Sequence, residues 1–459
     1  MTATWAAGAT AVAVTAVAER ASDADDASWP RPPVALYVHI PFCLSLCPYC
    51  DFVVYTGRAA CGPTARVETY LSALGVELEL RAAALDVTFG ARPPLRSVYL
   101  GGGTPSLLPA AAVGRLLKAI ERRFGLAGDA EVTLEANPGP ADRGDLAGFA
   151  AAGITRLSLG AQSMEPAELR RLGRRHTPQD VCATIAEARR AGFASLSVDL
   201  LYDVPGQTPA TWRRTLNAVL DAGVDHVSAY ALTLDDPDAE GLTGPLGDHL
   251  PTRPGARTWR ERARAEQDDD RAADLYQAAD ELLEARGLRW YELSNWARPG
   301  HEGRHNLAYW RHESYEALGA GAHAFDGGSR RRWNAARLDG YLEALLPRPA
   351  ADGARRPLRG AAPLGPLDGV ARPGQRAAAP RLPPGGDEQL DSATLAAEEV
   401  ILGLRLREGI DWRMAASPAV AEALIWGRAN GLVEDAGAGR VRLSLRGRLL
   451  SNELFARIV

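Results

Sequence analysis

Residues 34–50, VALYVHIPFCLSLCPYC, carry a short apolar run followed directly by three closely spaced cysteines. The β-branched and aromatic residues of the run predict a buried strand over 34–40. Cys43, Cys47 and Cys50 are separated by three and two residues, so one loop can wrap its thiolates around one face of an iron–sulfur cluster. Three thiolates on a [4Fe–4S] cluster leave one iron open for an exchangeable ligand.

Two other interpretations of these cysteines stay open. Zinc prefers four ligands, and His39 is a candidate for the fourth; three buried structural cysteines would need no metal. The chain has 5 cysteines in 459 residues, which excludes a disulfide scaffold and favours a reducing compartment. Cys61 has no role that we can argue, and Cys182 is expected to be a small buried residue of an amphipathic helix.

Outward from this loop, strand patterns alternate with helical patterns. The candidate strands cover residues 34–40, 96–101, 131–136, 154–160, 195–202 and 225–232. Six strand–helix units predict an α/β fold with a parallel sheet and outer helices, either doubly wound or closed into a barrel. Glycines or polar residues end several strands, where parallel α/β folds bind ligands: His39, Gly101–Gly103, Glu135, Gln162 and Asp199.

The rest of the chain divides by composition. We expect a disordered N-terminal extension over 1–33, a barrel over 34–330, a disordered Pro/Arg/Ala/Gly-rich linker over 347–389 and a small winged-helix-like domain over 390–459. Residues 240–270 are polar and broken by Pro and Gly, which predicts an exposed insertion. No apolar run is long enough for a transmembrane helix.

The charge balance of the chain and the composition of its N-terminal stretch bear on its partners and its cellular compartment. The chain has 52 Lys and Arg against 57 Asp and Glu, a net charge of −5, without a basic block. This balance argues against a nucleic-acid groove or an anionic membrane surface. Because the N-terminal Ala/Val-rich stretch lacks a basic region, we expect no signal peptide and a cytoplasmic protein.

Several further motifs match one family. YVHIPFC, CPYCDF, LGGGTPSLL, LEANPG, LSLGAQS, LGRRHT and VDLLYDVPGQT together resemble the radical S-adenosylmethionine (SAM) superfamily, and within it the oxygen-independent coproporphyrinogen III oxidases and their relatives. The resemblance runs from Tyr37 to about Phe325 and resumes in the C-terminal domain. It implies a partial (β/α)₆ barrel, with a [4Fe–4S] cluster on Cys43, Cys47 and Cys50.

The resemblance also implies a SAM site. Gly102, Gly103 and Thr104 would receive the SAM amino group, since the two glycines, which lack side chains, let backbone approach a ligand. Glu135 and Asp199 would accept from the amine and the ribose hydroxyls, although isolated carboxylates at strand ends can also be solvated caps. The remaining residues implied at this site are Gln162, Arg174, Tyr37, Tyr49 and Ala231, with Arg174 suited to the SAM carboxylate, Tyr49 packing on adenine and Ala231 offering its backbone to adenine.

Two features indicate a branch within the family. The oxidases resemble the pattern CxxxCxxCxC, and in this chain Phe52 stands at the position of the last cysteine of that pattern. The stretches YELSNWARPGH and HNLAYW resemble the heme chaperone (HemW-type) branch. That resemblance implies heme binding with His305 as axial ligand, and imidazole is a natural ligand of heme iron. His301, His312 and His323 are alternatives, and such a motif can also simply fold a loop onto the barrel mouth.

We therefore expect a heme chaperone that binds a [4Fe–4S] cluster, SAM and heme and transfers heme to an acceptor protein. Peripheral contact with a membrane-bound acceptor stays open. The alternative is oxidative decarboxylation of coproporphyrinogen III in porphyrin biosynthesis, and a third interpretation is a zinc-binding regulatory protein. Asp203, where the family usually has Gly, and LTLDDPDAEG depart from the family pattern near the substrate side.

Overall fold

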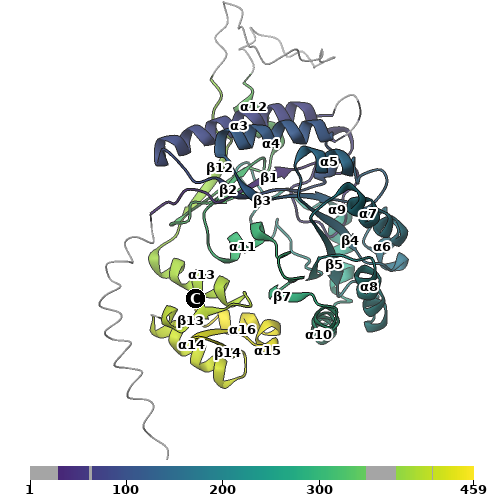
Figure 1. Ribbon diagram of the computed structural model, residues 1–459, viewed down its shortest axis with the longest axis vertical. Helices are drawn as coiled ribbons and strands as arrows, with labels where there is room; N and C mark the ends of the chain where they lie inside the picture. The colour runs from purple at the N-terminus through teal and green to yellow at the C-terminus, as the bar shows by residue number, and fades with distance from the viewer. Residues whose placement is uncertain (1–28, 61, 63–64, 348–378, 416) are drawn as a thin grey trace, which may run out of the picture.

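A parallel sheet forms the centre of the computed structural model, which describes residues 29–60, 62, 65–347, 379–415 and 417–459. Six strands pair in parallel, in chain order: β1 (Ala35–Ile40), β2 (Leu95–Gly102), β3 (Leu126–Ala136), β4 (Arg156–Gln162), β5 (Ser195–Tyr202) and β6 (His226–Ala231). All six predicted strands are present. The sheet curves around an interior (Figure 1), which confirms the predicted α/β fold with a partial barrel.

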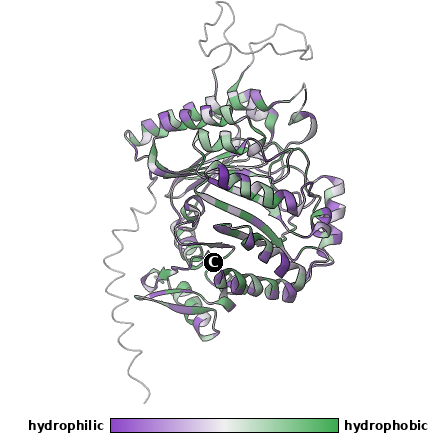
Figure 2. Cartoon of the chain, turned by 45° about the vertical axis from the view of Figure 1, so that its right-hand side comes forward, coloured by the Kyte–Doolittle hydropathy of each residue, from purple (hydrophilic) through white to green (hydrophobic). Residues whose placement is uncertain are grey.

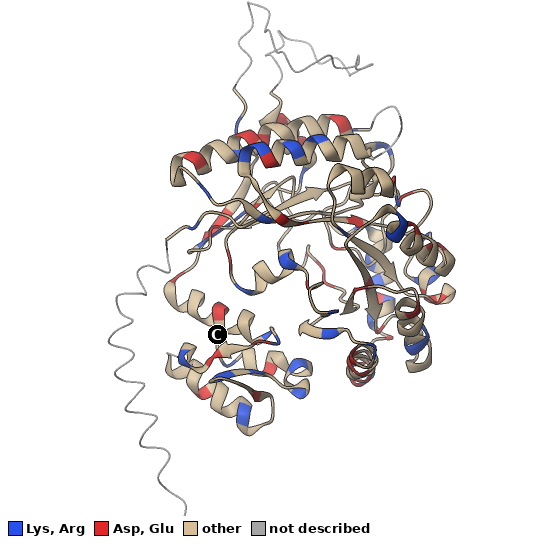
Figure 3. Cartoon of the chain, viewed as in Figure 1, with Lys and Arg blue, Asp and Glu red and all other residues tan. Residues whose placement is uncertain are grey.

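Helices cover the outer face of this sheet: α3 (Val67–Phe89), α4 (Ala110–Phe124), α5 (Leu146–Ala152), α6 (Pro166–Arg171), α7 (Pro178–Ala191), α8 (Pro209–Asp221), α10 (Asp269–Ala285) and α12 (Leu338–Leu345). Helix α9 (Pro254–Arg264) instead contacts the backbone of residues 48–50. In α4 the buried Val113, Leu117 and Ile120 recur three or four positions apart, as one apolar stripe requires. Figure 2 shows hydrophilic residues on the outer surfaces of the helices, and Figure 3 shows acidic and basic residues interspersed along them.

Helix α7 corrects one expectation. It ends at Gly192, which takes a left-handed conformation with φ +90° as the sequence predicts. Cys182, however, is exposed rather than buried. Val181, Thr184 and Ile185 occupy the inward face, and their helical spacing turns position 182 toward solvent.

The sheet continues beyond the six strands on both sides. Next to β1 follow β9 (Tyr315–Leu318), which is parallel to it, and then the antiparallel β10 (His323–Phe325), β11 (Arg330–Asn334) and β12 (Gly385–Gln389). Next to β6 follow β8 (Asn295–Ala297) and β7 (Arg289–Glu292). Short 3₁₀ turns lie at η1 (Gly57–Ala59) and η2 (Pro105–Leu107), and α11 (Arg304–Trp310) follows β8.

The structure can be compared with two predicted segments, the linker over 347–389 and the N-terminal extension over 1–33. Strand β12 falls within the predicted linker over 347–389 and pairs with β11, so that linker ends earlier than predicted. Residues 348–378 of the linker, and residues 1–28 of the predicted extension, lie outside the described residues. Arg31 N donates to Asp326 O at 2.7 Å, which ties the start of the described chain to the barrel.

The last seventy residues have a core of their own. They form α13 (Ser392–Leu404), β13 (Ile410–Asp411), η3 (Trp412–Met414), α14 (Pro418–Ala429), β14 (Val433–Gly437), β15 (Arg440–Leu443), α15 (Leu445–Leu449) and α16 (Ser451–Phe455). The three strands make a separate antiparallel sheet, and Leu404, Leu424, Leu443 and Leu454 are fully buried around it. That this unit belongs to the winged-helix class stays a prediction.

A buried ion pair joins this domain to the barrel. Arg448 donates to Asp280 of α10 at 2.9 and 2.7 Å, and its guanidinium lies 4.3 Å from the ring centre of Trp290. Trp296 Nε1 also donates to Asp280, at 2.8 Å. Within the described residues, no helix has the length and apolarity needed to cross a membrane.

Candidate functional site

A cavity of about 590 Å³ lies at the carboxyl ends of the parallel strands. All fourteen residues predicted from the sequence line it: Tyr37, Cys43, Cys47, Tyr49, Cys50, Gly102, Gly103, Thr104, Glu135, Gln162, Arg174, Asp199, Ala231 and His305. They meet because the ends of neighbouring parallel strands share one edge of the sheet. The structure therefore brings the predicted residues together, while their ligand roles stay predictions.

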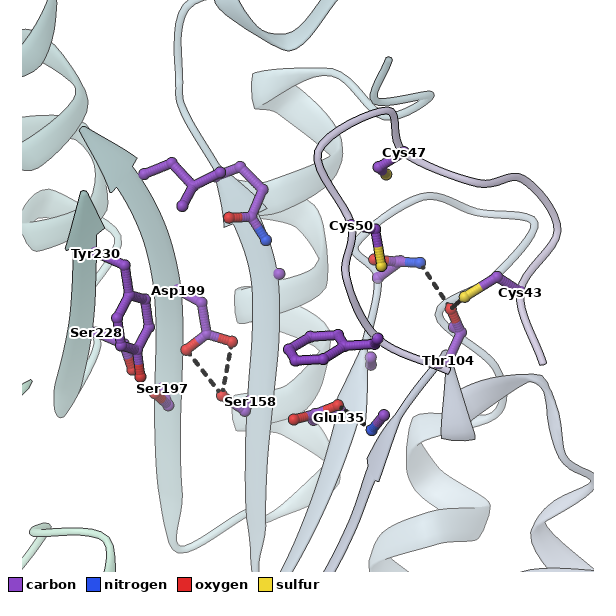
Figure 4. A pocket seen from close by; sticks show the side chains of 18 of the residues that line it. Cys43, Cys47, Cys50, Thr104, Glu135, Ser158, Ser197, Asp199, Ser228 and Tyr230 are labelled. Carbon is purple, nitrogen blue, oxygen red and sulfur yellow. Dashed lines mark hydrogen bonds between the residues drawn. The ribbon is translucent and has the colours of Figure 1, made fainter. Parts of the chain in front are cut away.

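The cysteine loop closes on itself just after β1. Tyr55 N donates to Pro41 O at 2.6 Å and Cys43 N donates to Tyr55 O at 3.1 Å, so the two ends of the loop are held together. Figure 4 shows the cysteines on this loop above the strand ends, with Cys43 Sγ 3.1 Å from Thr104 Oγ1. Burial raises the pKa of Cys43 to about 11 and also raises the pKa of Cys50. Metal binding to such thiols releases protons.

The donor set fits an iron–sulfur cluster better than zinc. The three thiols share one loop and one cavity, although no group of three His, Cys, Asp or Glu side chains converges into a ready metal cage in the described part of the chain. His39 does not offer a fourth ligand, because its Nδ1 lies 2.9 Å from Tyr37 Oη and its Nε2 lies 2.9 Å from Val53 O. Burial lowers the pKa of His39 to about 4, so the ring is neutral and acts as a brace for the loop.

Residues 240–270 are only partly the exposed insertion that the sequence predicts. They contain α9, whose Arg260 is 5% exposed. Its guanidinium donates to Pro48 O at 3.1 Å, Cys50 O at 2.8 Å and Asp235 O at 2.5 Å. Arg260 therefore fixes the backbone of the cysteine loop, and no local pattern in the sequence marks this role.

Glu135 faces the cavity from the end of β3. It accepts hydrogen bonds from Tyr99 Oη at 2.7 Å and from Gly102 N at 2.9 Å. Burial raises the pKa of Glu135 to about 7, against the effect of these two donors. A Cβ on Gly102 would lie 2.2 Å from the His39 ring, and φ there is +102°, so only glycine fits at this position. The carboxylate thus lies beside a backbone segment that leaves room for a ligand.

A second acceptor lies two strands away. Asp199 of β5 accepts from Ser158 Oγ at 3.1 Å, and burial raises its pKa (Figure 4). Between the two carboxyls, Gln162 adopts φ +69° at a bulge of β4 against β5. A positive φ at a residue other than glycine costs of order 1–3 kcal/mol, and such strain occurs mainly at functional sites.

Arg174 is one of three arginines that line the cavity, with Arg156 and Arg175. Its guanidinium donates to Gly160 O at 2.6 Å, to Asn137 Oδ1 and to Cys47 Sγ at 3.5 Å. Asn137, which sequence reasoning missed, also donates to Thr104 Oγ1 at 3.0 Å. Its position directly after the end of β3 was the available signal.

Tyr49 and Ala231 lie on one side of the cavity. Tyr49 packs on an apolar cluster that contains Leu172 and Leu201, and its ring centre lies 6.4 Å from that of Trp259. Ala231 ends β6 and is exposed. Tyr49 offers an apolar surface for a planar ring, whereas the Ala231 carbonyl already accepts from Thr233 Oγ1 at 3.3 Å.

His305 lies inside the barrel, on α11, and is 2% exposed. Its Nδ1 is 3.0 Å from Ser97 Oγ and its Nε2 is 2.8 Å from Tyr309 Oη. Burial lowers its pKa to about 3, so the ring is neutral. Ligation of iron by His305 therefore requires Nε2 to leave Tyr309 and a large ring to enter the interior.

The chain is similar to known proteins over most of its length. Residues 37–219 match the model of the radical SAM superfamily. A heme chaperone HemW of Mycobacterium tuberculosis (strain CDC 1551 / Oshkosh) is 39% identical over 428 residues, 93% of this chain and 95% of that protein. A heme chaperone HemW of Escherichia coli (strain K12) is 35% identical over 292 residues, 64% of this chain and 70% of that protein.

Among solved structures, coproporphyrinogen III oxidase (HemN) from Escherichia coli, described as a radical SAM enzyme, has the same fold. It superposes with a TM-score of 0.66 at 22% identity, covering 94% of this chain and 91% of that one.

Proposed function

This chain belongs to the heme chaperone HemW family within the radical SAM superfamily, and from that premise we propose that it binds a [4Fe–4S] cluster, SAM and heme and transfers heme to an acceptor protein. The observation that carries the proposal is the cavity, which gathers the cysteine loop and the polar strand ends at one place. Heme is cargo in this proposal, whereas the cluster and SAM are resident cofactors.

Cys43, Cys47 and Cys50 would hold the cluster, with Arg260 fixing their loop from α9. When bound, a cluster of this type supplies an electron to the SAM sulfonium. Thr104 and Arg174 contact Cys43 and Cys47, so these two polar groups would face the cluster sulfurs. Hydrogen bonds and charge near such sulfurs set the reduction potential.

SAM would lie between the cysteine loop and the strand ends. Glu135 would accept from its amino group, Asp199 from its ribose hydroxyls, and Arg174 would pair with its carboxylate. A positive amine beside Glu135 favours the ionised carboxylate and so offsets the effect of burial on its pKa. Tyr49 would pack against adenine.

We do not propose coproporphyrinogen decarboxylation as the activity. Phe52 replaces the further cysteine of the oxidases, and its side chain is 60% exposed. The acceptor would take heme in the cytoplasm, where reduced cysteines persist.

Anaerobic reconstitution with iron and sulfide, followed by heme titration, tests this function. We expect Cys43→Ala, Cys47→Ala and Cys50→Ala each to lose the cluster, measured as bound iron and sulfide. Cys182→Ala, which changes an exposed cysteine of α7, is the matched control and should keep it. The reconstituted chain should bind heme and form no protoporphyrinogen from coproporphyrinogen III and SAM. Formation of protoporphyrinogen in that assay would support the oxidase activity instead. A reconstituted chain that binds no heme would contradict the chaperone function.

A further inference from the structure

The eight histidines of this chain differ in whether a ring nitrogen is open to a ligand, and all eight lie in the described residues. His39, His226 and His305 are at most 4% exposed and have both ring nitrogens within hydrogen-bond distance of a partner. His176 is buried with Nε2 on Ala161 O, and His312 stacks on a phenylalanine with a buried Nε2. None of these five can meet a large planar ligand without rearrangement.

Two of the remaining three share one carboxylate at the rim of the barrel. Asp248 Oδ1 lies 3.0 Å from His249 Nδ1, and Asp248 Oδ2 lies 2.9 Å from His323 Nε2. The His249 and His323 side chains are 28% and 48% exposed. No described residue hydrogen-bonds Nε2 of His249, which is the outer nitrogen of its ring.

This Asp–His pair lies directly beside the cysteine loop. A Cβ on Gly321 would lie 2.5 Å from Val53 Cγ2 and 3.3 Å from Asp248 O, so the loop before β10, the segment after Cys50 and Asp248 are packed together. Residue 53 follows Phe52, which lines the cavity and is exposed. The pair therefore lies next to the segment that follows the cysteine loop, and Phe52 and Val54 of that segment line the cavity.

Apolar and basic groups adjoin the pair. Trp333 Nε1 donates to Leu246 O at 3.1 Å, its ring stacks on His323 with centres 6.1 Å apart, and Leu246 is 56% exposed. Arg337 donates to Gly244 O at 3.0 Å, which places a guanidinium on the same loop. A metalloporphyrin needs such a combination, because it has a large apolar face, a metal at its centre and two propionates at one edge.

We propose that His249 is the axial ligand of the heme cargo through Nε2, with Asp248 and His323 as the groups that position it. The inference rests on the proposed heme function and replaces His305 as the ligand. A carboxylate that accepts from Nδ1 of a neutral histidine fixes the tautomer with the lone pair on Nε2 and makes that nitrogen more basic toward a metal. The His249 side chain is partly exposed, which leaves part of its ring open to solvent.

Hemin titration of the full-length, cluster-loaded chain tests the inference, with the Soret band and electron paramagnetic resonance as readouts. We expect His249→Ala to change the ligation spectrum and weaken heme binding, and added imidazole to restore the spectrum. Asp248→Ala should weaken binding about 10–100-fold, as the loss of an outer-shell carboxylate does. His301→Ala is the matched control, since His301 is also partly exposed but bonds Ser195 Oγ through Nδ1. Cluster absorbance reports folding in every variant.

The outcomes separate the two proposals. Heme binding that is unchanged in His249→Ala and lost in His305→Ala would overturn the His249 assignment and leave the chaperone function intact. A spectrum that changes in His249→Ala without rescue by imidazole would also count against ligation. Absence of heme binding in the unchanged chain would overturn the proposed function, and the inference with it.

Discussion

At the scale of single residues, Glu135 links pH to SAM binding. Burial raises its pKa to about 7, so the carboxylate loses its charge as the pH falls below that value. An ionised Glu135 attracts the SAM amino group, whereas the protonated acid does not. We therefore expect the affinity for SAM to rise between pH 6 and pH 8. Equilibrium dialysis with the reconstituted chain at the two pH values measures this change.

Glu135→Gln provides the control for that titration. Its side chain keeps an acceptor for Tyr99 but cannot ionise, so its affinity for SAM should be lower at pH 8 and nearly independent of pH. The same rise with pH in Glu135→Gln would assign the effect to another group. Asp199, whose pKa burial also raises, would then be the next residue to change.

At the scale of elements, α9 supports the cysteine loop through Arg260. Hydrogen bonds from a charged donor contribute about 1.5–3 kcal/mol each when both partners are buried. Arg260→Ala removes the bonds to Pro48 O and Cys50 O, and we expect the bound cluster to be lost to an iron chelator at least about tenfold faster. The decay of cluster absorbance gives the rate.

Arg262→Ala is the matched variant, because Arg262 is exposed on the same helix. Its cluster should decay at the rate of the unchanged chain. Equal rates in Arg260→Ala and Arg262→Ala would show that the loop keeps its shape without support from α9.

At the scale of the whole molecule, Arg448 and Asp280 couple the C-terminal domain to the barrel. Their side chains are 5% and 14% exposed, so removal of one partner leaves a buried charge unpaired. We expect Arg448→Met to lower the free energy of unfolding by about 3–5 kcal/mol. Urea unfolding followed by tryptophan fluorescence measures it.

The double variant Arg448→Met with Asp280→Asn tests the cause. It removes both charges and keeps an acceptor for Trp296 Nε1, so much of the lost stability should return. A double variant as unstable as the single one would attribute the loss to packing of Arg448 on Trp290 instead.

Local patterns in the sequence predict the barrel strands, whereas contacts between distant segments are not predictable from it. The six strands follow from local apolar patterns, and the site residues converge because parallel strands end at one edge. Contacts between distant segments leave no such pattern. Arg260 meets Cys50 across 210 residues, and β12, with the sequence GGDEQ, has no apolar alternation because it is an exposed edge strand. Which ring nitrogens of His249 and His305 form hydrogen bonds likewise depends on tertiary contacts that the sequence does not reveal.

The place of β1 in the sheet has a consequence for biosynthesis. One edge of β1 pairs with β2, but the other pairs with β9, and Ala35 lies opposite Tyr315. That second edge stays open on the ribosome until β9 has been synthesised, and an unpaired edge is a template for aggregation. Gly319, which donates to Glu77 at 2.8 Å, closes the wall beside the cysteine loop only then. We therefore expect the proposed cofactors to be loaded after translation of most of the chain.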